Sequence, residues 1–118
     1  MIVKSMEVVR LMKSRFAVAA AVIALAPLAV SASPVALVLE NHRFATPQIT
    51  VPAGEKIRIE LTNRDSSADE FDSSDLRVEE DVTPHGRTVF QIGPLKPGTY
   101  RFMGEAHPAT AQGVIIAK

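Results

Sequence analysis

The sequence of 118 residues contains no cysteine. It therefore cannot form a disulfide, use a thiolate as a nucleophile, or build the zinc and iron–sulfur sites that need cysteine ligands. It also lacks a Gly-x-Ser-x-Gly elbow, a phosphate-binding loop and a glycine-rich dinucleotide turn. The sequence thus gives no support to the common hydrolase and nucleotide-binding classes.

Basic residues are scarce in the larger part of the chain. The whole chain has 13 basic and 13 acidic residues, but four of the basic ones and only one acidic one lie within the first fifteen positions. From Ser33 onward nine basic residues face twelve acidic ones, which leaves a net charge near −3. A mildly acidic domain argues against nucleic acid as a partner, because phosphate binding needs clustered lysine and arginine. It argues more weakly against binding to anionic membrane surfaces.

Only one long apolar run is present, the fifteen residues 16–30. This run is short for a membrane span, which needs about 20 residues. Lys13 and Arg15 precede it, and the small residues of Val30-Ser31-Ala32 follow. A basic start, a short apolar centre and a small-residue end are typical of a cleavable secretion signal.

We therefore predict a signal peptide over residues 1–32, cleaved after Ala32, and a mature domain over residues 33–118. Export would place that domain outside the cytoplasm. Translation from Met12 would give a more compact signal than translation from Met1. The alternative is that the apolar run is retained as a membrane anchor.

The mature part reads as a series of short strands separated by turn residues. Residues 56–63 (KIRIELTN) alternate between apolar and polar side chains, as a half-buried strand does. No segment carries a convincing helical stripe of apolar residues. The sequence predicts an all-β sandwich of the Greek-key kind with about seven strands, over residues 35–40, 48–51, 56–63, 76–82, 87–92, 99–103 and 113–117.

Acidic residues are concentrated in residues 69–81, where seven carboxylates accompany a single basic residue, Arg77. This run has two interpretations. It is a solvated face that keeps a small protein soluble, or it raises the local concentration of metal cations.

Three histidines are the other candidate functional groups. His85 lies between a proline and a glycine in a turn, and His42 lies in a break between strands, so we expect both at the surface. The alternative for His42 is that it binds a metal or supports a residue that does. His107 follows a predicted strand and lies close to Met103 and Glu105. A thioether, a carboxylate and an imidazole within five residues can bind copper or iron, although Met103 could equally pack and the other two could be loop polar residues.

The second half of the chain resembles the end of a cupredoxin. The run 93–102 (GPLKPGTYRF), the His107-Pro108 pair and the run 113–116 (GVII) are similar to the turn, ligand loop and last strand of that family. Upstream, the runs 51–55 (VPAGE) and 57–65 (IRIELTNRD) resemble it as well. The resemblance covers nearly all of the mature chain and implies a cupredoxin fold.

The ligand pattern departs from that of blue copper proteins. The position of the copper cysteine is Gly104 here, and the position of the first histidine ligand is assigned to Glu70. The axial methionine position holds Ala111 or Gln112, so only His107 is retained. A trigonal site of two histidines and a cysteine is therefore impossible.

The altered pattern resembles the EfeO-type cupredoxin-like domains, which accompany bacterial iron-uptake permeases and bind copper or ferric iron. This resemblance implies a periplasmic protein that binds copper, with iron possible, and that binds or oxidises iron for a permease partner. It implies Glu70 and His107 as metal ligands, with Met103 and Glu105 as further members of the motif. If Phe102 points into the core, however, alternation along the strand turns Met103 and Glu105 outward unless the chain bends near Gly104.

Two other functions remain open at this stage. The protein could store or carry copper without turnover, or it could be an interaction module that binds no metal. Oxygen reduction by a lone domain would need more metal centres than the chain can hold, so oxidase activity would require a redox partner.

Overall fold

The computed structural model describes residues 32–118. All of the predicted signal segment except Ala32 lies outside this range, as does the alternative start at Met12. Residues 32–118 contain no helix long and apolar enough to cross a bilayer.

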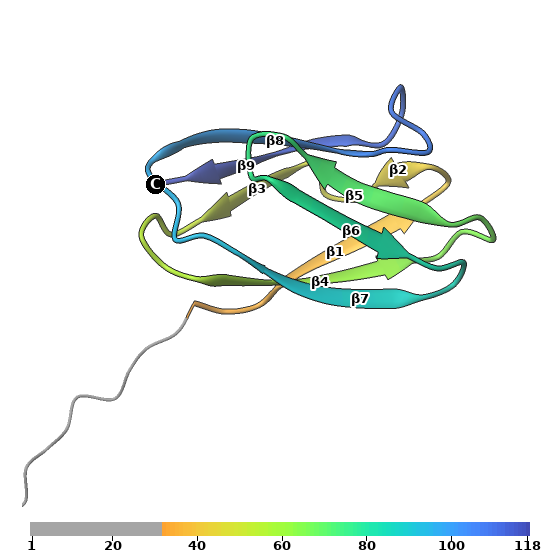
Figure 1. Ribbon diagram of the computed structural model, residues 1–118, viewed down its shortest axis with the longest axis horizontal. Coiled ribbons are helices and arrows are strands. Elements are labelled where there is room, and N and C mark those ends of the chain that lie inside the picture. The colour runs from red at the N-terminus through yellow and green to blue at the C-terminus, as the bar shows by residue number, and fades with distance from the viewer. Residues whose placement is uncertain (1–31) are drawn as a thin grey trace, which may run out of the picture.

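Within residues 32–118, nine strands form two facing sheets that pack as a sandwich (Figure 1). The four-stranded sheet has the order β2-β1-β4-β7, and the five-stranded sheet has the order β3-β9-β8-β5-β6. Their bounds are β1 Val35–Glu40, β2 Arg43–Phe44, β3 Gln48–Val51, β4 Ile57–Asn63, β5 Asp69–Ser73, β6 Val78–Val82, β7 Arg87–Ile92, β8 Gly98–Gly104 and β9 Gln112–Ala117. The prediction of an all-β sandwich is confirmed, and all seven predicted strands are present with small shifts at their ends.

Most neighbouring strands are antiparallel, and two pairs are parallel. β1 runs parallel to β4, and β3 runs parallel to β9. The segment between β1 and β3 therefore crosses from one sheet to the other, with the short β2 hairpinned onto β1 on the way. Such crossovers produce the Greek-key path that the sequence predicts.

The core lies between the two sheets and follows from the alternation in the sequence. In β4 the side chains of Ile57, Ile59 and Leu61 are buried, and the residues between them are more exposed. Four phenylalanines meet in the centre of the core, with ring centroids 4.9–6.5 Å apart: Phe44, Phe71, Phe90 and Phe102. Aromatic pairs at such separations add stability beyond the area they bury.

One end of the sandwich is organised by the buried side chain of Asn63, at the end of β4. Its amide nitrogen donates hydrogen bonds to the carbonyl oxygens of Ser67 and Thr83, at 2.8 and 3.1 Å. Its amide oxygen accepts the N–H of Asp65 at 3.0 Å. Asn63 thus fixes the loop 64–68 and, through it, the point where β5 begins.

Candidate metal site at one end of the sandwich

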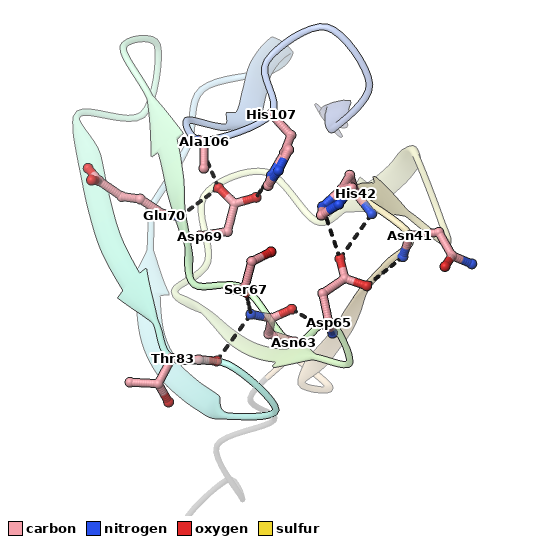
Figure 2. Close-up of polar contacts among 10 residues, drawn as sticks. All are labelled: Asn41, His42, Asn63, Asp65, Ser67, Asp69, Glu70, Thr83, Ala106 and His107. Atoms are coloured by element: carbon pink, nitrogen blue, oxygen red, sulfur yellow. Dashed lines mark hydrogen bonds and ion pairs between the residues drawn. The ribbon is translucent and has the colours of Figure 1, made fainter.

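The carboxylate of Asp69 lies at the centre of the site. Asp69 is the first residue of β5, and its side chain is only 2% exposed. One oxygen accepts the N–H groups of Glu70 and Ala106, at 2.8 and 3.0 Å. The other oxygen lies 3.1 Å from Nδ1 of His107. A single buried carboxylate therefore joins β5 to the loop that follows β8 (Figure 2).

The loop 105–111 is held so that His107 faces Asp69. The backbone of Gly104 pairs with Ala111, since the Gly104 N–H donates to the Ala111 carbonyl at 2.8 Å. The His107 carbonyl accepts the N–H groups of Thr110 and Ala111, which makes the loop a tight turn. The His107 side chain is 29% exposed, so part of the ring is accessible to solvent.

A second histidine covers the first. The imidazole rings of His42 and His107 are stacked, with centroids 3.6 Å apart and planes 21° from parallel. His42 lies in the turn between β1 and β2 and has a positive φ of 58°, which only a few non-glycine residues adopt. Its Nδ1 is buried, makes no hydrogen bond to any group of residues 32–118, and lies 3.5 Å from an oxygen of Asp65.

The turn that carries His42 is fixed by the Asp65 carboxylate. This group accepts the backbone N–H of Asn41 at 2.7 Å and that of His42 at 2.9 Å. The bond from the His42 N–H lowers the pKa of Asp65, and the Asn41 N–H adds to this effect against the opposing effect of burial. Each histidine of the stack therefore faces one carboxylate, His42 facing Asp65 and His107 facing Asp69.

A separate acidic cluster lies on the outer face of the five-stranded sheet. Carboxylate oxygens of Glu70, Asp72 and Glu79 lie within 4.8 Å of one another. The pKa of Glu70 is raised to about 7, first by a hydrogen bond with the Glu105 carboxyl group and then by burial and by repulsion from Glu105, Asp81 and Glu79. The outer face thus holds a group of carboxylates that repel one another.

The four residues predicted as metal ligands divide between these two places. Glu70 and Glu105 lie together on the outer face, and Met103 is 38% exposed on the same side, opposite Asp72 in the β8–β5 register. His107 lies with Asp69 instead, and Figure 2 shows the Glu70 side chain pointing away from it. The structure therefore does not bring Glu70 and His107 together, and the outward direction expected for Met103 holds.

Asp69 and Asp65 are not among the site residues predicted from the sequence, and for His42 the sequence favours a surface position over a supporting role. Alternation along β5 offered a signal for the first of these, because Phe71 is apolar and residues two apart share a face. If Phe71 faces the core, then Asp69 faces it too and Glu70 faces solvent. The expected surface position of His42 is also only partly right, since its Nδ1 is buried against the site.

The site does not fit a blue-copper centre. A Cβ atom placed on Gly104 would lie 2.9 Å from both an Asp69 oxygen and the Ala111 Cβ. The position where a cysteine would be required is therefore filled by the Asp69 carboxylate and the Ala111 methyl group. The donors that are present, an imidazole nitrogen and a carboxylate oxygen, are types that bind copper, zinc or iron. Their separation of 3.1 Å is close to that of two neighbouring ligand atoms each about 2.0–2.2 Å from one ion.

The sequence matches the cupredoxin-like domain family over residues 14–117. It is 40% identical over 82 residues to an uncharacterised protein of Rickettsia prowazekii (strain Madrid E), across 70% of this chain and 66% of that protein. The match thus spans just under two thirds of that relative's length.

Solved structures of blue copper proteins share the fold at low sequence identity. Auracyanin A, a "blue" copper protein from Chloroflexus aurantiacus, is similar with a TM-score of 0.64 and 12% identity, over 73% of this chain and 98% of that one. Auracyanin from Roseiflexus castenholzii gives a TM-score of 0.63 and 17% identity, over 75% and 99% of the two chains. Amicyanin from Paracoccus versutus gives 0.57 and 21%, over 75% and 85%.

Proposed function

Because the chain belongs to the cupredoxin-like domain family, we propose that it is an exported metal-binding protein that holds copper through His107 and Asp69. The observation that carries the proposal is the 3.1 Å separation between the His107 Nδ1 and the Asp69 carboxylate, in a loop and strand that are both firmly fixed. Imidazole and carboxylate ligands without a thiolate suit Cu(II). When bound, copper would supply one-electron redox chemistry.

The residues around the pair support such a site. Two backbone N–H groups hold one oxygen of Asp69, so the other oxygen, which faces His107, has little freedom to move. His42 covers one side of the His107 ring and limits the access of water from that side. A ligand pair fixed in this way loses little conformational entropy when a metal ion binds. Water or a group from a partner would complete the coordination.

A second function is favoured by the acidic cluster on the outer face. The oxygen ligands of Glu70, Asp72 and Glu79 suit Fe(III), and a cation would relieve the repulsion among these carboxylates. We propose that this face gathers iron, and that the protein supports iron uptake by delivering iron to a permease in the same membrane system. The secretion signal predicted over residues 1–32 supports a periplasmic location for that role.

The copper proposal is tested by titrating the purified protein with Cu(II) in a calorimeter and recording electron paramagnetic resonance spectra. We expect one saturable site whose spectrum reports nitrogen ligation, without intense blue colour. His107→Ala should weaken binding by about 100-fold or more, because even residues that only orient a ligand contribute 10–100-fold. His85→Ala is the matched control, since His85 is an exposed turn histidine, and it should leave the affinity unchanged. Equal affinity in His107→Ala and the parent protein would refute the site.

The iron proposal has its own experiment. Fe(III) supplied as a soluble citrate complex should bind to the parent protein and to His107→Ala, and it should bind weakly to the double variant Glu70→Gln, Asp72→Asn. The double variant should keep its copper affinity. If neither metal binds saturably to the parent protein, the alternative of an interaction module without a metal stands in place of both proposals.

A further inference from the structure

Among residues 32–118, no strand pairs with the outer edge of β7. β7 is the last strand of the four-stranded sheet and forms one border of the molecule (Figure 1). The N–H of Asn63 donates to the carbonyl of Gly86 at 2.8 Å, which continues the β4–β7 register by one residue. In an antiparallel pair every second residue forms backbone hydrogen bonds to the partner strand, so the even-numbered residues of β7 direct their backbone N–H and C=O groups towards β4. Arg87, Val89 and Gln91 therefore direct their backbone N–H and C=O groups away from the sheet.

This edge differs from the other strand edges of residues 32–118. β6, which ends the five-stranded sheet, carries Glu79, Glu80 and Asp81, and such charges keep two copies apart. β2 and β3 have only two and four residues. β7 has six residues and a single charge, that of Arg87, which is paired with Glu60 in the neighbouring strand, and Val89 is 42% exposed. Unprotected edges of this kind are templates for pairing with another strand.

We propose that β7 pairs antiparallel with β7 of a second copy of this chain, about a two-fold axis through Val89. In this register Val89 lies opposite Val89 of the other copy, and Arg87 lies opposite Gln91. The three outward residues carry one donor and one acceptor each, so all six groups of one edge find partners on the other. A shift of the register by two residues would leave some of these groups unpaired.

The side chains are compatible with the same register. Arg87, Val89 and Gln91 are all exposed on the outer face of the sheet, where they would form cross-strand pairs. Val89 would meet its own apolar copy, and the Gln91 amide would meet a guanidinium group. No two like charges face each other between the two copies, because Arg87 lies opposite the uncharged Gln91. Arg87 is also paired with Glu60 at 2.7 Å within its own subunit. The two four-stranded sheets would become one sheet of eight strands.

Sedimentation equilibrium tests the proposal on the protein in the form that the cell produces, at concentrations up to the millimolar range. We expect a reversible monomer–dimer equilibrium. Val89→Pro removes an outward N–H that makes no bond within the subunit, so it should leave thermal stability nearly unchanged while it raises the dissociation constant by about tenfold or more. Val89→Thr keeps the N–H and is the matched control, which should still dimerise.

Hydrogen exchange provides an independent measurement. The amides of Val89 and Gln91 should exchange more slowly in concentrated than in dilute protein, while exchange elsewhere should not depend on concentration. If Val89→Pro fails to fold, Val89→Lys serves instead, because it sets two charges face to face on the axis. A parent protein that stays monomeric at all concentrations, or a Val89→Pro variant that dimerises as tightly as the parent, would overturn the proposal.

Discussion

Removing the Asp69 carboxylate tests the buried group that joins β5 to the loop after β8. In Asp69→Ala the backbone N–H groups of Glu70 and Ala106 lose their acceptor, and His107 loses its charged neighbour. The carboxylate is 2% exposed, so the groups it leaves behind are shielded from bulk water. The change therefore leaves buried donors unsatisfied as well as removing favourable bonds.

The expected cost follows from these three contacts. Each orphaned buried donor costs about 1–3 kcal/mol, and partial entry of water from the open side would place the values near the lower end. Two backbone donors and the loss of the His107 contact together give a destabilisation of about 3 kcal/mol. For a domain of this size that corresponds to a fall in Tm of about 15 °C.

Urea denaturation followed by circular dichroism measures the change, with Asp72→Ala as control. Asp72 lies in the same strand, two carboxylates after Asp69, and points to the outer face. Its replacement should change stability by less than about 0.5 kcal/mol. Asp69→Asn should lie between the two, because its amide oxygen still accepts backbone N–H groups. A loss in Asp69→Ala no larger than that in Asp72→Ala would show that the carboxylate does not hold the loop in place.

Two further predictions concern pH and packing. The Glu70 pKa is raised from 4.5 to about 7, so between these pH values the folded state holds a proton on Glu70 that the unfolded state has lost. The contribution of this group to the free energy of unfolding is therefore present at low pH and is lost as the pH rises through about 7. Glu70→Gln should flatten that decline in melting curves recorded from about pH 5 to about pH 8, and an unchanged slope would contradict the assigned Glu70–Glu105 interaction. Gly113→Ala should destabilise the protein by about 1–3 kcal/mol in urea denaturation, because its new Cβ would overlap the Phe102 ring. In the control Gly98→Ala the nearest heavy atom lies 3.8 Å from the new Cβ, so this change should be tolerated. Equal effects of the two changes would refute the packing argument.

The strands that could be predicted from the sequence are those whose inward residues are apolar. The alternation in 56–63 gives β4, and the apolar run 113–117 gives β9 with one further residue at its start. Turn residues such as Pro52, Gly54 and Gly86 mark the ends of neighbouring strands. These signals are local, and local signals suffice for a two-layer β fold.

β5 could not be found in the same way, because the residues that it buries are mostly polar. Of its five residues, Asp69, Phe71 and Ser73 are buried, and only Phe71 is apolar. Ser73 is accommodated because its hydroxyl donates to the Arg101 carbonyl of β8 at 2.6 Å. Hydrogen-bond partners of buried polar residues come from distant parts of the chain. Local hydropathy alone therefore indicates a charged surface run at these positions.

The sequence predicts the loop that carries His107, but it does not predict Asp69, which the structure places beside that histidine. His107 was identified because it follows a predicted strand, and that position is set by local sequence. Its contacts with Asp69 and His42 depend on β5 and on the β1–β2 turn, which lie 38 and 65 positions earlier in the numbering. The sequence-based prediction names Glu70, the neighbour of Asp69 in β5. Neighbouring residues of a strand point to opposite faces of the sheet, so Glu70 lies on the outer face and Asp69 on the inner one.

The overlap of the His42 and His107 rings gives the site a built-in spectroscopic reporter. Protons held above an aromatic ring resonate upfield of their usual positions, so the carbon-bound protons of both imidazoles should be displaced in the NMR spectrum of the folded protein. Any event that slides or separates the rings would return those signals toward free histidine. Movements at this end of the molecule can therefore be followed without attaching a label.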